Sequence, residues 1–181
     1  MTDCRAVPAM ILAVLALGAC NRSDVVAKNE SAESVAKKVA EADIRLEPGR
    51  WESVMKIDKM EIANLPASAK AAMEQQQGTT HTFTTCLTPE EAAKPSASFF
   101  QKGASGCTYD HFTMAGGRID AEMTCKQGTG PTHMTMKGEY GGDHYAMAIK
   151  SQGEMQPGMA MNVAMTINSR RLGDCTGNET G

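Results

Sequence analysis

Two stretches of alternating apolar and polar residues, separated by a pair of glycines, constrain the fold of this chain most strongly. Residues 132–140 and 143–150 flank Gly141-Gly142, and nearly every apolar side chain larger than alanine falls on one side of the two stretches. Alternation is typical of a β-strand with one buried face, and glycines tolerate the positive φ of a tight turn. A hairpin is therefore predicted. Its expected cross-strand pairs are Met136 with Met147, Met134 with Ile149 and Gly138 with Tyr145.

Further segments carry the same signals, so the sequence predicts a mainly β fold with minor α. The other expected strands are residues 51–57, 79–87, 107–113 and 118–126, and a last strand with Met161, Val163, Met165 and Ile167 facing inward. Residues 65–77 predict a helix that Gly78 stops. Thr88, Pro89 and Glu91 have the residue types of a capping box and predict a second short helix. We expect an antiparallel meander of about seven strands, which could curl into a partial barrel or pack on the two helices.

A short apolar run near the N-terminus predicts the compartment. Residues 7–17 follow Arg5 and are too few to span a bilayer as a permanent helix, so they are typical of a secretory signal. The residues Leu17 to Cys20 resemble the lipobox of bacterial lipoproteins, which implies cleavage before Cys20 and a lipid on its thiol. The alternative is an ordinary signal peptide followed by a chance cysteine. Because Asn21 follows, we expect the outer membrane, with the domain facing the periplasm.

Composition divides the chain into four parts. The predicted signal is residues 1–19, and residues 20–47 comprise the lipid-bearing cysteine and a charged segment without glycine or aromatic residues. Such a composition predicts a solvated tether, with a helix expected around residues 34–43. Residues 48–176 are the predicted β domain and residues 177–181 a disordered tail. The net charge of −3, without a long basic stretch, argues against binding to nucleic acid.

Of the six cysteines, Cys4 is lost with the predicted signal and Cys20 carries the predicted lipid, so four remain. In an oxidising compartment they predict two disulfides, with three possible connectivities. A hairpin centred on residues 115–117 sets Cys107 opposite Cys125, close enough to bridge, and Cys86 then pairs with Cys175 by elimination. The competing arrangement joins Cys86 to Cys107 and Cys125 to Cys175.

Several short motifs, taken in their order along the chain, resemble a known family. They are Gly49-Arg50-Trp51, Cys86-Leu87-Thr88-Pro89-Glu90, Cys107, Cys125 and the ending Arg171-Leu172-Gly173-Asp174-Cys175. Together they resemble the secreted Gram-negative proteins grouped as domain of unknown function 3617, with a Gly-x-Trp start and an Arg-x-Gly-x-Cys-like finish. The resemblance covers about residues 46–175 and implies a secreted, cysteine-linked domain. It implies no catalytic residue and no substrate.

Fourteen methionines raise the hypothesis of a periplasmic copper site, because thioethers are soft ligands that suit Cu(I). The candidate ligands are His133, Met134, Met136, Met155, Met159 and Met161. The competing interpretation is that methionine fills the core in place of leucine, as expected for the candidates on the predicted inner side of strands. Only Met155 and Met159 fall in a predicted loop.

Motifs of the common catalytic classes are missing from the sequence. It contains no Gly-x-Ser-x-Gly elbow, phosphate loop, Cys-x-x-Cys pair or zinc-protease helix, and its four histidines are scattered singly. We therefore expect a non-enzymatic, periplasm-facing lipoprotein without a cofactor, whose small β domain binds a protein partner or an apolar ligand. A Met-rich copper-binding periplasmic module is the alternative.

Overall fold

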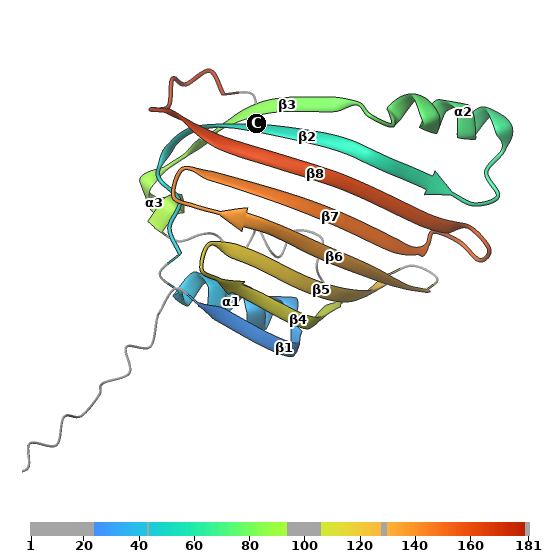
Figure 1. Ribbon diagram of the computed structural model, residues 1–181, viewed down its shortest axis with the longest axis horizontal. Helices are drawn as coiled ribbons and strands as arrows, with labels where there is room; N and C mark the ends of the chain where they lie inside the picture. Colours follow the sequence, from blue (N-terminus) through green and yellow to red (C-terminus); the bar gives the residue numbers. More distant parts are fainter. Residues whose placement is uncertain (1–23, 43, 94–105, 128–129, 180–181) are drawn as a thin grey trace, which may run out of the picture.

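The computed structural model describes residues 24–42, 44–93, 106–127 and 130–179. These residues form one eight-stranded antiparallel sheet and three helices (Figure 1). The strands are β1 (Val25–Ser31), β2 (Gly49–Ile62), β3 (Thr80–Leu87), β4 (Cys107–Ala115), β5 (Arg118–Gln127), β6 (Gly130–Tyr140), β7 (His144–Glu154) and β8 (Ala160–Gly173). The helices are α1 (Ala32–Glu41), α2 (Ala67–Gln76) and α3 (Pro89–Ala93). The predicted fold class is confirmed, with one strand more than expected.

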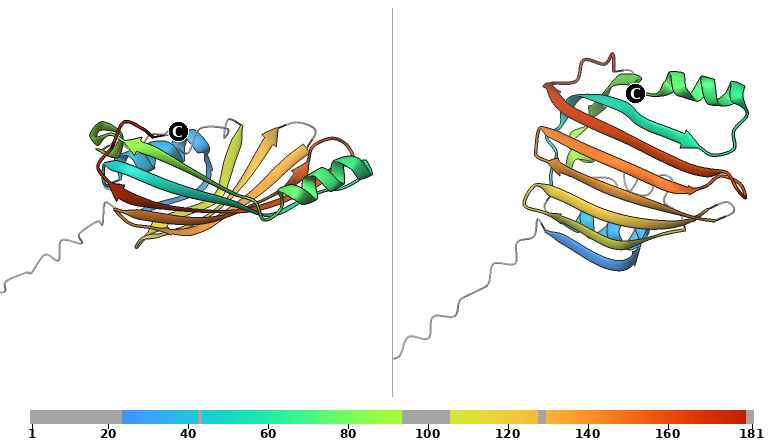
Figure 2. Two further views of the ribbon diagram at one scale, coloured as in Figure 1. Left: turned by 90° about the horizontal axis from the view of Figure 1, so that it is seen from above. Right: turned by 45° about the vertical axis from the view of Figure 1, so that its right-hand side comes forward.

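The strand order is β1-β4-β5-β6-β7-β8-β2-β3, and each neighbouring pair is antiparallel. Strands β4 to β8 form a meander. β2 pairs with β8, the last strand of the meander, and β3 pairs with the other side of β2. β1 and β3 are the two edges, so the sheet is not closed. The sheet is curved, and α1 lies on its concave side at the β1 edge (Figure 2). We call this concave side the inner face.

The buried core lies between α1 and the inner face of β1, β4 and β5. Val35 and Val39 of α1 are 0% and 1% exposed, and they belong to the same buried cluster as Tyr109 and Phe112 of β4. The two aromatic rings meet edge to face with centroids 5.2 Å apart, an arrangement that aromatic pairs favour. Ser31 caps the helix, since its hydroxyl accepts a hydrogen bond from the backbone of the first turn.

The prediction that residues 20–47 form a solvated tether is wrong from residue 25 onward. Val25 and Ala27 are each 4% exposed in β1, which pairs with β4, and Ile44 is 6% exposed in the same core. The charges that favoured a tether lie on the solvent side of β1 and α1. The expected helix near residues 34–43 corresponds to α1, but the helix is packed on the sheet.

The hairpin of β6 and β7 has a different register from the predicted one. Tyr140 pairs with Tyr145 and Met136 with Ile149, so the turn is centred on Gly142-Asp143 instead of the two glycines. Each residue faces a partner two positions further along than predicted. Because side chains alternate with a period of two, a shift of two keeps every apolar residue on the expected face.

Both disulfides that followed from the predicted register are present, namely Cys107–Cys125 and Cys86–Cys175. The register near the first of these is reached by a different route. The turn consists of Gly116 and Gly117 alone, which would offset the cysteines by one position. Asp110 is a β-bulge in β4, and its extra residue restores the direct opposition of the two cysteines.

The remaining helices lie away from the core. α2 has no buried residue and projects from one end of the sheet, and Gly78 follows it with φ +76° (Figures 1 and 2). The capping box of α3 is present as predicted. The Thr88 hydroxyl accepts a hydrogen bond from the Glu91 amide at 3.2 Å, and the Glu91 carboxylate accepts one from the Thr88 amide at 3.0 Å. These bonds hold the pKa of Glu91 below its usual value.

Two predicted segments fall wholly or partly outside the described residues. The signal, residues 1–19, and Cys20 lie outside them. In the predicted disordered tail, residues 177–179 are described and form a hydrogen-bonded turn. The Glu179 carboxylate accepts hydrogen bonds from the amides of Thr176 at 2.7 Å and Gly177 at 3.0 Å.

Candidate functional site

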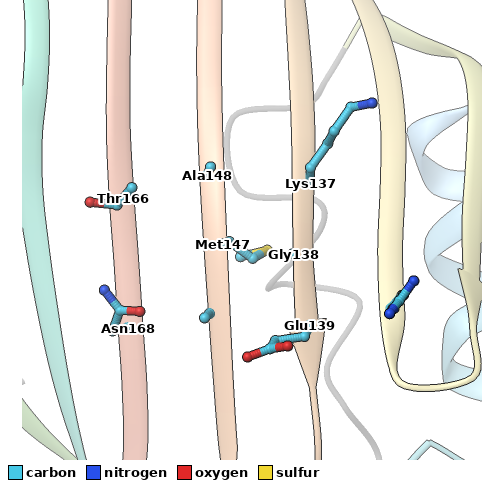
Figure 3. Close-up of a pocket in the computed structure, with 9 residues that line it drawn as sticks. Lys137, Gly138, Glu139, Met147, Ala148, Thr166 and Asn168 are labelled. Carbon is cyan, nitrogen blue, oxygen red and sulfur yellow. The ribbon is translucent and has the colours of Figure 1, made fainter.

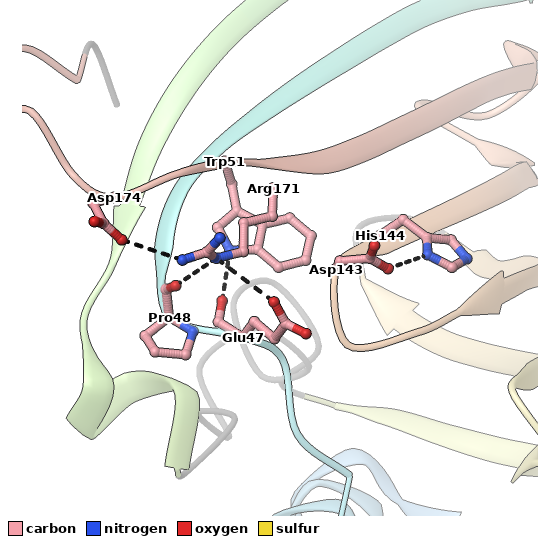
Figure 4. A network of polar contacts seen from close by, with 7 residues as sticks. All are labelled: Glu47, Pro48, Trp51, Asp143, His144, Arg171 and Asp174. Carbon is pink, nitrogen blue, oxygen red and sulfur yellow. Dashed lines mark hydrogen bonds and ion pairs between the residues drawn. The ribbon is translucent and has the colours of Figure 1, made fainter.

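The first and last motifs of the folded region meet where β2 begins and β8 ends (Figure 4). The Arg171 guanidinium donates a hydrogen bond to the Pro48 carbonyl at 2.7 Å, and it reaches the Asp174 carboxylate at 3.4 Å. Its Nε also lies 3.8 Å from a carboxylate oxygen of Glu47. The Trp51 indole donates to the backbone carbonyl of Glu47 at 3.0 Å. Arg171 thus connects the end of β8 to the segment that leads into β2.

Glycine is required at the centre of this cluster. Gly49 has φ +136°, and a Cβ there would lie 2.2 Å from the Gly173 carbonyl oxygen and 2.9 Å from the Arg171 Nε. The disulfide Cys86–Cys175 joins β3 to the residues just after β8 in the same region, with its Cα atoms 5.5 Å apart. These groups bond to one another, so we interpret the cluster as a structural junction, which we call the β2–β8 junction.

The strongest candidate for a binding site is the part of the inner face that lies beyond α1. Twelve apolar side chains of β2, β6, β7 and β8 share that part of the face, as the strand registers show. They are Met55, Ile57, Met60, Ile62, Met134, Met136, Met147, Ile149, Met161, Val163, Met165 and Ile167, and we call them the open inner face. Each is partly exposed, whereas residues of β4 and β5 on the same side are at most 7% exposed beneath α1.

The open inner face is large enough to matter energetically. It spans four adjacent strands, which at ~4.8 Å per strand is a width of about 15 Å between the outer two. Along β8 it runs from Met161 to Ile167, about 20 Å at ~3.3 Å per residue. The outline is therefore on the order of 300 Å², the size of the largest apolar patch on many monomeric proteins, and such patches are often functional.

Polar-tipped residues close one end of this surface. The hydroxyl oxygens of Ser53 and Ser169 lie 2.6 Å apart, and the two residues are 3% and 4% exposed. Next to them the rings of Trp51 and Tyr145 stack with centroids 6.1 Å apart. The buried serines satisfy each other, so they add a polar boundary without an unpaired group.

The outer face of the sheet carries charges and a shallow depression of about 450 Å³ (Figure 3). Small residues, Gly138, Ala146 and Ala148, contribute to it, with charged and polar side chains around them. At its side Lys137 pairs with Asp120 at 3.1 Å. Hydrogen bonds from His111 and then from Lys137 hold the pKa of Asp120 below its usual value. The depression is open to solvent and its lining includes three charged side chains, Arg118, Lys137 and Glu139, so a ligand there would remain exposed to water.

The structure places the six candidate copper ligands at three separate locations. Met134, Met136 and Met161 lie on the open inner face, His133 on the outer face, and Met155 and Met159 in the turn between β7 and β8. His133 and Met134 are neighbours in one strand and therefore point to opposite faces. The His133 imidazole instead lies 3.1 Å from the Thr124 hydroxyl. In the described ranges, no three His, Cys, Asp or Glu side chains form a group that could hold a metal.

Sequence reasoning found most residues of the open inner face, but not that the described helices leave this face partly exposed. Alternation tells which side of a strand is apolar, and it does not tell what covers that side. One signal was available in the predicted helix 65–77. Within α2 the only side chain larger than alanine that is apolar is Met73, so this helix cannot cover a sheet.

A family model described as Protein of unknown function (DUF3617) matches residues 46–175, which is more than half of the chain. No curated protein and no solved structure matches the chain. Among the helices in the described part of the chain, none is both long and apolar enough to cross a membrane.

Proposed function

The chain belongs to the DUF3617 family, and we propose that it is a non-enzymatic lipoprotein of the cell envelope that binds an apolar ligand on its open inner face. One observation carries the proposal, namely the twelve partly exposed apolar side chains on the concave side of a curved sheet. Ligand sites are concave and mostly apolar, with a few polar groups at their edges.

The composition of this surface supports an apolar ligand of variable shape. Seven of its twelve members are methionines, whose flexible, polarisable side chains adapt to irregular partners. The Met147 side chain lies against Gly138, where a Cβ would be 3.0 Å from the Met147 Cγ. Covering about 300 Å² of apolar surface contributes at most about 8 kcal/mol from the protein side, before the cost of association is subtracted.

The location of the protein is proposed from the sequence together with the disulfides. The lipobox-like residues before Cys20 support an anchor in the outer membrane, and two disulfides agree with the oxidising periplasm. Two or three acyl chains give stable anchoring where one chain would be marginal. Metabolic labelling with a fatty acid tests this: the Cys20→Ser variant should lose the label, and label retained on it would place the anchor elsewhere.

Ligand binding is tested by titrating the protein with a fluorescent fatty-acid analogue. Met165→Glu places a charge at the centre of the open inner face, and we expect it to weaken binding at least tenfold. Thr166→Glu is the matched control, because the next residue of the same strand points to the outer face. Melting curves of both variants establish that they fold. If wild-type protein does not bind the analogue, or both variants bind it equally well, the inner face is not the site.

A further inference from the structure

The chain leaves the folded domain very close to the proposed lipid anchor. Only four residues separate Cys20 from Val25, the first residue of β1. Five residue steps reach at most about 18 Å even when fully extended. The 14 residues of β8 span roughly 45 Å, so the far end of the sheet can stand that far from the anchor. The end at which β1 starts is therefore the one that the anchor holds within about 18 Å of the bilayer.

The position of that end is well defined. Val25 pairs with Met114, next to the turn between β4 and β5. The turn between β6 and β7 and the β2–β8 junction lie at the same end of the sheet, whereas α2 projects from the opposite end (Figure 1). Asp24, the residue before β1, lies near Tyr140, and after burial its carboxylate is the second cause that raises the pKa of Tyr140. We call these turns and the junction the β1-start end.

The side chains of the β1-start end suit a water–lipid interface. Tyr140 and Tyr145 pair with each other here, and both are partly exposed. The Tyr145 ring stacks on Trp51, which is only 4% exposed and supports it from below. Rings with an apolar body and a polar tip are enriched where lipid meets water. Two exposed aliphatic side chains add to them, Val26 at 67% and Leu172 at 37%.

Backbone hydrogen bonds join the parts of this end into one surface. The Tyr140 amide donates to the Gly117 carbonyl at 2.8 Å, and the Glu47 amide donates to the Gly142 carbonyl at 2.7 Å. A third bond runs from the Arg171 amide to the Asp143 carbonyl at 2.8 Å. Because adjacent turns are tied together, the surface keeps its shape and can define an orientation.

We propose that the β1-start end lies directly against the bilayer, so that the strands of the sheet lead away from the membrane and the domain has one preferred orientation. This inference rests on the lipid anchor of the proposed function. The partner is the lipid surface itself. Acidic and basic side chains are mixed at this end, as Glu47, Asp143 and Arg171 illustrate, so the contact does not depend on attraction to anionic headgroups and should persist at high salt.

The test uses the full lipidated protein in vesicles of phosphatidylethanolamine and phosphatidylglycerol. Single cysteines carrying a fluorophore are introduced as His144→Cys and Glu154→Cys, two exposed positions at opposite ends of β7 that share the outer face. They lie about 33 Å apart along the strand. A quencher attached to the lipid headgroup should quench the label at position 144 several-fold more than the label at 154. The pair Asp143→Cys and Gln156→Cys, in the two turns, repeats the comparison if either β7 variant misfolds.

Equal quenching at the two ends, or stronger quenching at the far end, would overturn the proposed orientation. Flotation of the same vesicles separates this outcome from failure of the anchor. Protein that floats with the vesicles but is quenched equally has an anchor and no preferred orientation. Protein that does not float has no anchor, which would refute both the orientation and the anchor on which it rests.

Discussion

Replacing Gly49 with alanine is the most direct way to examine how the β2–β8 junction holds the two ends of the domain together. The alanine would have to adopt φ +136°, a conformation that costs an L-residue on the order of 1–3 kcal/mol. Its Cβ would also lie 2.2 Å from the Gly173 carbonyl oxygen, so β2 and β8 would have to move apart. That movement disturbs the hydrogen bond from Arg171 to Pro48, and bonds of a charged group contribute about 1.5–3 kcal/mol.

Together these terms predict that Gly49→Ala lowers the free energy of unfolding by about 3–5 kcal/mol, a large part of the ~5–15 kcal/mol of a typical domain. Urea denaturation of a soluble form beginning at residue 21, followed by circular dichroism, gives this free energy. Gly158→Ala is the matched control, since Gly158 also has positive φ, +80°, but nothing lies within 4 Å of its Cβ position. The control should cost only about 1–2 kcal/mol. If the two variants lose the same stability, the close approach at Gly49 is not what the junction depends on.

Three further predictions concern the core, the disulfides and the capping box. Val35→Ala should lower the free energy of unfolding by about 1.5–3 kcal/mol, whereas Val26→Ala, at a 67% exposed site, should change it by less than about 0.5; equal effects in urea denaturation would contradict a buried α1. Serine replacement of both cysteines should cost about 4–5 kcal/mol for Cys86–Cys175 and about 3 kcal/mol for Cys107–Cys125, because they close loops of 89 and 18 residues; the reverse order would refute the chain-entropy argument. Because the pKa of Glu91 is lowered, the stability that its ionised carboxylate contributes is complete above the ordinary Glu pKa of about 4.3 and is lost as the pH falls through the lowered value. Wild type and Glu91→Gln should therefore differ in melting temperature near neutral pH and converge in strong acid.

The features that the sequence predicted well depend on residues close together in the chain. The capping box needs only Thr88 and Glu91, three positions apart, and both of its hydrogen bonds are present. The face of each strand was also predictable, because alternation depends on neighbouring residues. The turn between β6 and β7 was not, since Gly141-Gly142 fits the centre of a two-residue turn as well as it fits the turn centred on Gly142-Asp143 that the protein adopts.

The pairing of Cys107 with Cys125 was predicted correctly although one structural detail was missed. The prediction assumed a turn of three residues, and the protein has a two-residue turn and a bulge at Asp110. The two changes offset each other, so the cysteines remain opposite. A bulge adds one residue to one strand without a distinctive side chain, and for that reason alternation alone did not reveal it.

Among the described helices, the incomplete cover of the inner face follows from the size of the N-terminal helix. An α-helix with its side chains is about 10–12 Å wide, and strands are spaced by ~4.8 Å, so one helix covers two to three strands. An eight-stranded sheet is about 34 Å wide between its edge strands, and α1 packs on β1 and β4. Its buried residues are only valines and alanines, which gives it no long side chain to reach further across the sheet. β1 and α1 also precede the family-matched region, which starts at residue 46. The segment that resembled a tether by composition therefore determines where the core ends, and the open inner face begins where its single helix stops.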